Sequence, residues 1–447
     1  MKRFLIETFG CQMNEHDSEK ISGLLSHRGM VPVHSIEEAD LFILNTCSVR
    51  EKAVHKVYSR LGEIRKQRGS DPNFFIGVVG CVAQQESQNM KQKAPFVDLV
   101  VGTHMYHALP DLLDDLDKKN KPVKQLVVTE FLDDPAPVEI EPILRSSQFR
   151  ANITITEGCN KHCSFCIVPY TRGKERNRPS PVILEEIRKA ADQGFVEILL
   201  LGQTVNSYKD PQKHSFRFAD LLAKVAEIKG IRRVRFTSPH PREFNDSTIS
   251  VIEEMETICN QVHLPVQSGS NPILKKMRRQ YTRENFLELV EKFKNLQRPI
   301  ALSTDIIVGF PGETDADFEQ TLSLVKQVEF ESMFSFKYSP RPYTEAAPWT
   351  NAVPEAEKTK RLIMLQKLQT SLQFKIHQDR YMGRQFEVLV EGKARDGKQR
   401  FGRTTSNKIV NFPGKEPPGT FSEILVTKIG SNSLVGHSLK KFIKNCA

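Results

Sequence analysis

Short apolar runs alternate with amphipathic segments over the first 120 residues. The runs "KRFLIETFG", "DLFILNT", "FFIGVVG" and "VDLVVGT" are rich in Ile, Val, Leu and Phe and predict buried strands. Residues 15–28, 50–68 and 83–92 lie between them and have helical periodicity. Strands that alternate with helices indicate a parallel sheet, so we expect a doubly wound α/β domain over residues 1–120.

A second strand–helix rhythm begins at residue 149 and repeats six times. Its predicted strands are "RANITIT", "VEILLLG", "RRVRFTS", "QVHLPVQ", "ALSTDIIVGF" and "SMFSFKY", with helices near 181–193, 218–229, 245–258, 283–297 and 314–328. Six units are too few for a closed eight-fold barrel, so we expect a partial (β/α)6 barrel with a groove for a large substrate. A long helix predicted at 354–381 completes this domain, residues 149–381. The proline-containing residues 121–148 predict a linker with room for one strand.

Residues 382–445 have a different character. Alternating β-branched residues in "FEVLVEG", "SEILVTKI" and "SLVGHSL", separated by Gly and Pro turns, predict a small all-β barrel or sandwich. From Gly383 to the end, Lys and Arg number 12 and Asp and Glu number 5, so most of the chain's net charge of +10 lies here. A small basic β-domain suits an RNA partner, and a soluble basic cap is the alternative.

The composition is that of an ordinary globular protein, with 39% hydrophobic and 26% charged residues in a chain of 447. No apolar run approaches the ~18 residues that span a membrane, and the N-terminus enters a strand-like segment without room for a signal peptide. We therefore expect a cytoplasmic protein without a membrane segment. In such a protein, eight cysteines are better explained as metal ligands or catalytic thiols than as disulfides.

Three cysteines of the first region each follow a predicted strand: Cys11, Cys47 and Cys81. The carboxyl ends of parallel strands meet at one edge of a sheet, where ligands bind in open α/β folds. Because adjacent strands lie ~4.8 Å apart, the three thiolates can converge on one iron–sulfur cluster. Three buried structural cysteines are the alternative, although burial does not explain their common edge. Cys259 and Cys446 have no such neighbours and are interpreted as incidental.

Cys159, Cys163 and Cys166 form a C-x3-C-x2-C motif just after the first barrel strand, on the rim where barrel active sites form. A tetrahedral zinc site would need a fourth Cys or His, and His162 inside the loop is poorly placed to supply it. Three cysteines on a 4Fe–4S cluster leave one iron open to a substrate or cofactor. The spacing therefore favours an open cluster over zinc.

The segment "GCNKHCSFCIVPYTRGKERNRP", in a six-unit barrel, resembles the radical S-adenosylmethionine superfamily. The three-cysteine N-terminal domain and the basic C-terminal β-domain narrow the resemblance to the methylthiotransferases, whose terminal β-domain is called TRAM. "ETFGCQMNEHDSEK", "NTCSVREKA", "GCVAQQE", "LPVQSGSNPILKKMRRQYT" and "STDIIVGFPGET" are similar to further motifs of that family, so the resemblance covers all three regions. "VPYTRG" is most similar to the tRNA-modifying branch, the MiaB type.

The resemblance implies two 4Fe–4S clusters and a specific reaction. N6-dimethylallyladenosine beside the anticodon of certain tRNAs would gain a methylthio group at carbon 2. One S-adenosylmethionine would donate a methyl group to sulfur at the N-terminal cluster, and another would be cleaved at the barrel cluster to a 5′-deoxyadenosyl radical. We also expect a tRNA anticodon stem-loop as partner, an electron donor such as flavodoxin or ferredoxin, and a monomer. A radical mechanism needs no general acid or base, so no catalytic side chain is named.

Seven residues on the barrel rim are candidates for binding S-adenosylmethionine. Phe165 precedes the last cysteine of the motif and is placed to pack on the adenine, with plain loop packing as the alternative. Of the other six, Asp305 lies within the fifth strand and the rest stand at strand ends, where a glycine permits close approach and a polar side chain meets the cofactor, although glycine at such turns is often only structural. The six are Gly202, Gln203, Gln267, Ser268, Asp305 and Gly309.

Three basic segments are candidate RNA contacts: "YTRGKERNR", "KKMRRQYTR" and "GKARDGKQRFGR". A single charge run is often only a solvated face, but two of these segments lie by barrel strand ends. The candidate residues are Arg172, Lys174, Arg176, Arg178, Lys275, Lys276, Arg278, Arg279, Arg400 and Arg403. If about five phosphates are neutralised, the logarithm of affinity falls by roughly 3.5–4.5 per decade of salt.

Two alternative functions stay open on the sequence. A non-catalytic iron–sulfur or zinc RNA-binding protein would explain the cysteines and the charge, but it would leave the barrel and its rim motifs unused. A sister methylthiotransferase, acting on threonylcarbamoyl-adenosine in tRNA or on a ribosomal protein, would have the same architecture.

Overall fold

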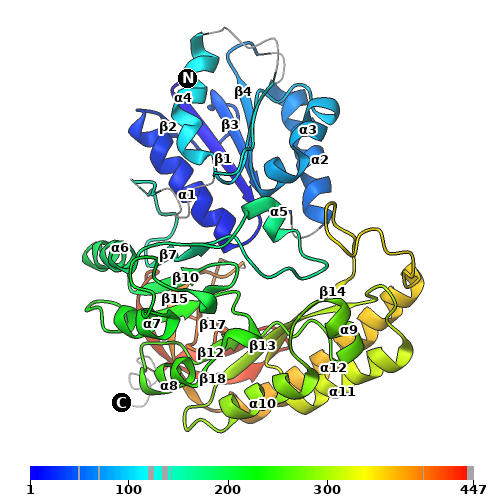
Figure 1. Cartoon of the computed structure of the whole chain (residues 1–447). Coiled ribbons are helices and arrows are strands. Elements are labelled where there is room, and N and C mark those ends of the chain that lie inside the picture. The colour runs from blue at the N-terminus through cyan, green and yellow to red at the C-terminus, as the bar shows by residue number, and fades with distance from the viewer. Residues whose placement is uncertain are drawn as a thin grey trace.

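Figure 1 shows the computed structural model, in which an N-terminal α/β domain lies above a partial barrel and a small β-domain packs behind that barrel. The structure describes residues 1–48, 51–68, 71–118, 125–132, 139–141, 143–395 and 397–439. Cys446, interpreted above as incidental, lies outside these residues. Of the helices in the described part of the chain, none is both long enough and apolar enough to cross a lipid bilayer.

Six parallel strands form the sheet of the N-terminal domain, in the order β2-β1-β3-β4-β5-β6. Their bounds are β1 Arg3–Phe9, β2 Val31–Pro32, β3 Leu41–Thr46, β4 Phe75–Gly80, β5 Leu99–Val101 and β6 Leu126–Val128. Every residue of β3 ("LFILNT") is buried, because a central parallel strand is covered on both faces. The predicted strands over this region are therefore confirmed.

Helices cover both faces of this sheet. Apolar residues of α1 (Gln12–His27) and α4 (Leu109–Lys118) pack on one face, and those of α2 (Glu51–Arg68) and α3 (Cys81–Lys93) on the other. The predicted doubly wound fold is confirmed. The pattern did not predict α4, the short helix η1 (Tyr106–Ala108) before it, or the position of β6, which extends the sheet from within the predicted linker.

The six predicted barrel strands are all present, and they do not close into a ring. Their bounds are β7 Arg150–Thr154, β10 Glu197–Leu201, β11 Arg233–Phe236, β12 Gln261–His263, β13 Ala301–Val308 and β14 Ser332–Lys337. They form two parallel sheets, β7-β10-β11 and β12-β13-β14, and an isolated bridge pairs Val234 of β11 with Ile258, three residues before β12. Because β7 and β14 are the two ends of this series, the barrel is partial, as predicted.

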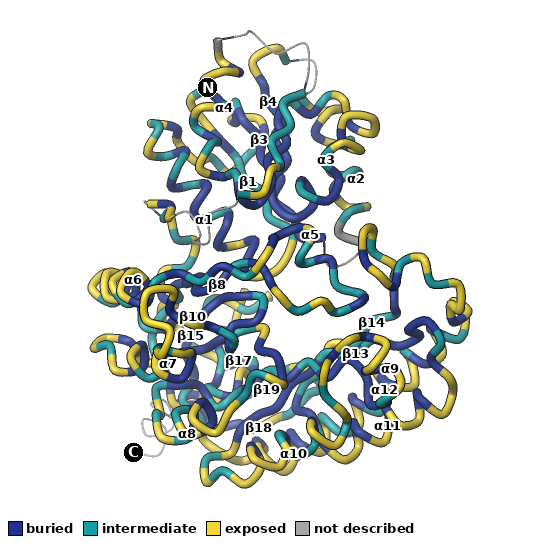
Figure 2. Tube along the Cα trace, in the orientation of Figure 1, coloured by how far each residue is buried: buried dark blue, intermediate teal, exposed yellow. Residues whose placement is uncertain are grey.

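Helices surround the outer face of these strands, and Figure 2 shows the exposed outer sides of the helices. They are α6 Ser180–Asp192, α7 Phe218–Ala226, α8 Asp246–Glu254, α10 Arg283–Lys294, α11 Asp315–Val328 and α12 Glu355–Arg380. The Thr314 side chain caps α11 by accepting the N–H of Asp317 at 3.2 Å. Short elements fill the connections: β8 Thr156–Glu157, α5 Val168–Arg172, β9 Arg176–Asn177, η2 Val205–Ser207, η3 Pro241–Glu243 and α9 Asn271–Lys276.

The C-terminal domain is a closed barrel in the order β15-β16-β17-β19-β18. Its strands are β15 Gln385–Lys393, β16 Arg400–Arg403, β17 Ile409–Phe412, β18 Phe421–Ile429 and β19 Leu434–Ser438. Of the two predicted architectures, barrel or sandwich, the barrel is confirmed.

Arginines at the beginnings of the barrel strands hold the C-terminal domain. Arg150, the first residue of β7, pairs with Glu391 at 2.9 Å, and Arg233, the first of β11, donates to the Glu387 carbonyl at 2.9 Å. Arg235 donates to the Thr404 carbonyl at 2.7 Å. The basic β-domain thus lies at the opposite end of these strands from the cysteine loops.

Candidate iron–sulfur active site

The structure brings Cys11, Cys47 and Cys81 together at the carboxyl edge of the N-terminal sheet. Cys11 hydrogen bonds with Cys47, and Cys81 lies close enough to Cys11 for their charges to interact. Gly80, with φ +87°, lets β4 turn directly into α3, so that Cys81 becomes the first helical residue. A Cβ on Gly80 would stand 2.3 Å from Oδ1 of Asn45, which is why the turn requires glycine.

Two buried asparagines hold the Cys11 loop, and sequence reasoning missed both. Asn45 donates from Nδ2 to the Asn14 carbonyl at 2.9 Å, and Asn14 donates from Nδ2 to Oδ1 of Asn45 at 3.1 Å. The Cys11 thiol donates to Asn14 Oδ1 at 3.4 Å. Asn45 could have been found from the sequence, because it is an amide near the end of the otherwise apolar run "DLFILNT". A polar side chain in a buried strand needs hydrogen-bond partners.

The loop after β7 holds the second trio of cysteines. Gly158 has φ +75°, and a Cβ there would stand 2.1 Å from the Lys174 carbonyl oxygen, so glycine is required directly before Cys159. Cys159 Sγ lies 3.3 Å from the Thr204 hydroxyl and accepts the N–H of Lys161 at 3.3 Å. These contacts fix one thiol at the carboxyl ends of β7 and β10.

The other two thiols of this trio face the same space. Cys163 accepts a hydrogen bond from Nη1 of the buried Arg279 at 3.5 Å, and the N–H of Cys166 donates to the Cys163 carbonyl at 3.0 Å. Burial and the neighbouring Cys163 and Cys159 raise the pKa of Cys166 to about 12. Burial also raises the pKa of Cys159. Raised pKa values at Cys159 and Cys166 fit a cationic iron centre, which would stabilise their thiolates.

The N-terminal trio fits such a centre as well. Burial raises the pKa of Cys81, whereas the hydrogen bond with Cys47 lowers the pKa of Cys11 to about 6, with a further contribution from Arg172. Cys47 and Cys81 are buried, and Cys11 is exposed.

The spacing expected of the thiolates differs between a zinc site and an iron–sulfur cluster. Among the residues that the structure describes, no three His, Cys, Asp or Glu side chains lie close enough to hold one metal ion. Four thiolates about 2.3 Å from one zinc would stand only ~3.8 Å apart. In a 4Fe–4S cluster each thiolate binds a different iron, so wider spacing is expected. The choice of a cluster over zinc therefore stays a prediction of the cysteine spacing in the sequence.

The N-terminal domain docks on the mouth of the barrel, which is the end formed by the carboxyl ends of its strands. The cysteine loop after β7 lies at this end. Met13, in the first turn of α1, packs against Leu199 and Leu201 of β10, and the Thr154 hydroxyl of β7 lies 3.7 Å from its sulfur. Met13 is two residues after Cys11. The docking therefore brings the N-terminal trio over the carboxyl ends of the barrel strands, and Figure 1 shows α5 lying between the two domains.

Buried ion pairs cross this interface. Arg172 of α5 pairs with Asp17 of α1 at 2.5 Å, and Lys20 of α1 pairs with Glu157 at 3.5 Å. Although burial opposes ionisation, Lys20, Arg176 and Arg172 lower the pKa of Glu157 to about 2. Glu157 directly precedes Gly158 and Cys159, so one network joins the docking helix to the second cysteine loop.

The expected RNA contact through "YTRGKERNR" is corrected for three of its four basic residues. Arg172, Arg176 and Arg178 are only 4–5% exposed. Arg172 pairs with Asp17, Arg176 pairs with Glu157 at 3.1 Å, and Arg178 pairs with Glu186 at 2.8 Å. Because carboxylates inside the protein occupy these guanidinium groups, phosphates do not reach them in this structure. Lys174 is the exposed member of the run.

The second basic segment, "KKMRRQYTR", also contains both buried and exposed basic residues. Arg279 is buried and donates to Cys163 and to the Pro265 carbonyl, so its expected RNA contact is corrected to a contact with the cysteine loop. Lys275 and Lys276 are exposed, and Arg278 is exposed and pairs with Glu345 at 2.6 Å.

Arg400 and Arg403 of the β-domain are half-buried. Arg403 pairs with Glu391 at 3.0 Å, and Arg400 donates to the Lys415 carbonyl at 3.1 Å. They lie in the domain that packs at the far end of the barrel strands, roughly 17 Å from the mouth for a strand of five residues.

The candidate cofactor residues fall into two groups. Asp305 points into the barrel, where His263 Nε2 lies 3.3 Å from its carboxylate, and Phe165 at the cysteine loop packs edge-on against Phe310. Gln267 lies at the same rim, with φ +72°, and its backbone bonds with β13. These residues line the mouth. Gln203 also lies there, and its Oε1 accepts the N–H of Gly158 at 2.5 Å.

The remaining three have structural partners. Ser268 is buried against Thr321 of α11 at 3.4 Å. A Cβ on Gly309 would meet Lys358 of α12 at 2.3 Å, and one on Gly202 would meet Thr156 at 2.4 Å. Their expected contacts with S-adenosylmethionine stay predictions.

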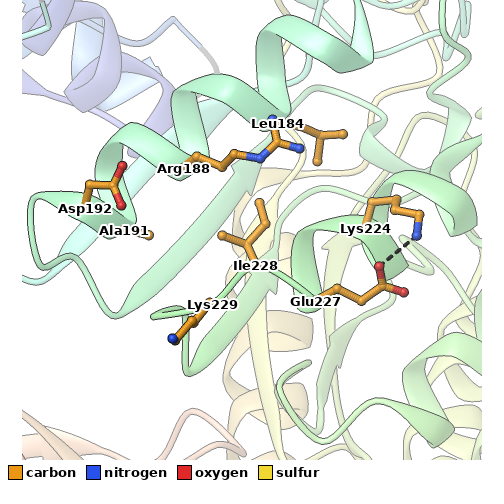
Figure 3. Close-up of a pocket in the computed structure, with 8 residues that line it drawn as sticks. All are labelled: Leu184, Arg188, Ala191, Asp192, Lys224, Glu227, Ile228 and Lys229. Atoms are coloured by element: carbon orange, nitrogen blue, oxygen red, sulfur yellow. Dashed lines mark hydrogen bonds and ion pairs between the residues drawn. The ribbon is translucent and has the colours of Figure 1, made fainter.

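A groove between α6 and α7 lies on the outside of the barrel (Figure 3). Arg188, Lys224 and Glu227 on its walls are each more than half exposed, and Lys224 pairs with Glu227 at 2.7 Å. The groove contains no cysteine and lies apart from the mouth.

Comparison with known proteins gives three matching family profiles. They are the Radical SAM superfamily over residues 153–325, the Uncharacterized protein family UPF0004 over residues 3–102, and the TRAM domain over residues 379–439.

Curated relatives match almost the whole chain. A tRNA-2-methylthio-N(6)-dimethylallyladenosine synthase of Solibacter usitatus (strain Ellin6076) is 46% identical over 98% of both chains, and one of Clostridium botulinum (strain Langeland) is 46% identical over 98% of this chain and 97% of its own. The chain belongs to the tRNA-2-methylthio-N6-dimethylallyladenosine synthase family. The family member of Moorella thermoacetica is 45% identical over 93% of both chains.

Solved structures agree with this family at the level of the fold. The radical S-adenosylmethionine methyltransferase TsrM of Kitasatospora setae superposes with a TM-score of 0.57 at 14% identity, covering 78% of this chain and 75% of its own. At that identity the likeness shows the fold alone. The member of the synthase family described here therefore combines a radical SAM core with the N-terminal and TRAM domains that its profiles match.

Proposed function

We propose that this chain attaches a methylthio group to carbon 2 of N6-dimethylallyladenosine in tRNA, with S-adenosylmethionine as methyl donor and radical source. The observation that carries the proposal is the alignment with synthases of that name across 98% of both chains. The interface described above supports it, because a reaction of two half-steps needs two sites that share one substrate. The docking of Met13 against β10 brings the two cysteine trios to the same mouth.

The proposed function includes two clusters. Cys159, Cys163 and Cys166 would hold a 4Fe–4S cluster with one open iron, and Cys11, Cys47 and Cys81 a second one. When bound, one cluster would pass on the electron that cleaves S-adenosylmethionine, and the other would hold the sulfur that is transferred. The chain's residues hold the thiols in place: Asn14 and Asn45 on one side, Thr204 and Arg279 on the other.

The mouth residues give the remaining parts of the proposal. Asp305 and Gln267 would bind polar groups of S-adenosylmethionine, and Phe165 its adenine, because these three lie on the rim near the cysteine loop. Gln203 would act by holding Gly158 and hence Cys159. We further propose a cytoplasmic monomer that receives electrons from a donor such as flavodoxin or ferredoxin.

The modified nucleoside tests the function directly. A strain that lacks the chain is expected to accumulate N6-dimethylallyladenosine in tRNA and to lack its 2-methylthio derivative, as measured by mass spectrometry of tRNA nucleosides. A plasmid copy of the chain should restore the derivative. Persistence of the derivative in the deletion strain would contradict the proposed substrate, and loss of a methylthio group from threonylcarbamoyl-adenosine or a ribosomal protein would assign the chain to a sister activity.

Exposed cations by the mouth predict a measurable salt dependence of tRNA binding. Lys174→Ala and Lys276→Ala should each lower the slope of log affinity against log salt by roughly 0.7–0.9, because each loses one phosphate contact. Lys224→Ala, on the outer groove of Figure 3, removes the same charge and should leave the slope unchanged. If Lys174→Ala and Lys276→Ala had the same salt slope as Lys224→Ala, the RNA would bind away from these two lysines.

A further inference from the structure

Exposed aromatic side chains gather near the barrel mouth. The described part of the chain has five exposed aromatic side chains, of which the first four named here lie near the mouth: Phe131, Tyr170, Phe334, Tyr343 and Phe374, each 42–63% exposed. Tyr170 is four residues after Cys166, Phe334 lies 6.3 Å from His263 by ring centroids, and Phe131 contacts His104 at the domain interface. Phe374, on α12, is the member away from the mouth. Large apolar faces left in water at one place usually mark a binding surface.

Two of these rings form a pair. The centroids of Tyr170 and Tyr343 lie 6.1 Å apart, with their planes inclined by 34°. Tyr170 is on α5, and Tyr343 is on the segment after β14. That segment is tied to the cysteine loop, since the N–H of Ala346 donates to the carbonyl of Ser164, between Cys163 and Cys166, at 2.8 Å. The pair therefore has a fixed position beside the second cysteine trio.

The backbone at Tyr343 is strained in a way that supports a binding role. Its φ is +69°, a conformation that is unfavourable for a residue with a side chain. The next residue, Thr344, holds it in place by donating its N–H and its hydroxyl to the Arg341 carbonyl, at 3.2 and 2.7 Å. The Tyr343 ring is 63% exposed, so packing in the core does not compensate for the strained backbone. Strain of this kind is typical of functional sites.

The charges near the pair select the class of ligand. Lys174 follows Tyr170 by four residues, and the exposed Arg278 pairs with Glu345, two residues after Tyr343. The exposed Lys276 lies on the same segment as Arg278. Exposed aromatic rings among cations are the usual surface for single-stranded nucleic acid, in which bases stack on the rings and phosphates meet the cations. An apolar protein partner would leave the exposed Lys174 and Lys276 without an acidic counterpart.

We propose that Tyr170 and Tyr343 form a platform on which an unstacked base of the tRNA loop, next to the target adenosine, stacks. The inference rests on the proposed function, because it takes that loop as the ligand. The platform takes the neighbouring base because the pair lies outside the mouth, whereas the target carbon must reach the site lined by the second trio. Stacking of the neighbouring base on the two tyrosines would separate it from the target adenosine and direct the adenosine into the mouth.

Binding of an anticodon stem-loop RNA, with 2-aminopurine at the neighbouring position, tests the platform. Tyr170→Ala and Tyr343→Ala should each weaken binding, measured by anisotropy, by roughly 5- to 150-fold. The 2-aminopurine should stay bright in their complexes but be quenched in the wild-type complex. The salt slope should not change, because no phosphate contact is lost. Tyr170→Phe and Tyr343→Phe keep the stacking faces and should bind within about twofold of wild type.

Matched controls separate the platform from general effects. Phe374→Ala removes an equally exposed ring from α12 and should bind as wild type does. Equal iron content and unfolding midpoint in all variants would establish that they fold. Wild-type affinity in both alanine variants would overturn the platform and leave the pair as a surface for a protein such as the electron donor. A loss in the phenylalanine variants as large as in the alanine ones would also overturn it. Failure of the wild-type chain to bind the stem-loop would instead contradict the proposed function.

Discussion

Replacing Cys159, Cys163 and Cys166 together by alanine is expected to remove about four of about eight irons and to abolish cleavage of S-adenosylmethionine. The reason is geometric: Cys11 is held by Asn14, and Cys81 begins α3 at the edge of the other sheet, so no thiol of that trio replaces the lost ligands. Iron analysis and the electron paramagnetic resonance spectrum of the reduced protein measure the loss independently of activity. Methylthiolation should fall below detection.

The reciprocal variant separates the roles of the two trios. With Cys11, Cys47 and Cys81 changed to alanine, the chain should again hold about four irons, and it should cleave S-adenosylmethionine but form no methylthio product. Cys259→Ala is the matched control, because Cys259 is buried, lies away from both trios, and should leave iron and activity unchanged.

Two results would contradict this division. If either triple variant kept about eight irons, other residues would be ligands. If either lost all of its iron, the two sites would not be independent.

The sequence predicted the elements of the fold well because their signals are local. A run such as "DLFILNT" shows its burial directly in its composition, and all six residues of β3 are buried. The six barrel strands were found for the same reason. The strand β6 was not predicted as part of the sheet. It has only three residues, all half-buried, and so short a pattern cannot be distinguished from that of a linker.

The charged residues were harder to interpret, because a sequence shows a charge but not its partner. Arg172 was expected to meet phosphate, yet its partner Asp17 stands on the first helix of another domain. Arg279 was misread in the same way, since Cys163 is remote from it in sequence. A usable signal existed elsewhere: Arg233 and Arg235 alternate in a predicted buried strand, which indicates that another surface covers their ends, and the β-domain does so.

The buried pair of Arg172 and Asp17 leads to the second large prediction. Arg172→Met should lower the free energy of unfolding by roughly 3–5 kcal/mol, because it leaves the buried Asp17 carboxylate with Tyr106, whose hydroxyl lies 3.3 Å away. Burial disfavours the charged form of Arg172, but Asp17 holds the pKa of Arg172 well above the ordinary value. Urea titration measures the loss.

A surface pair provides the control. Lys189 and Glu141 stand 3.6 Å apart, with side chains 55% and 66% exposed, so Lys189→Ala should cost less than about 1 kcal/mol. If Arg172→Met cost no more than that, the pair would not stabilise the interface.

The double variant tells an ion pair from a packing contact. In Asp17→Leu with Arg172→Met no buried charge is left unpaired, so stability should recover most of the loss seen in Arg172→Met. The hydrogen bonds from Thr103 and His104 to the backbone carbonyls of Thr171 and Arg172, at 2.7 and 3.0 Å, remain and keep α5 docked. Hydrogen exchange of the α5 amides should then match wild type, whereas in Arg172→Met alone it should be faster. A double variant no more stable than Arg172→Met would show that the guanidinium acts by filling space and not by its charge.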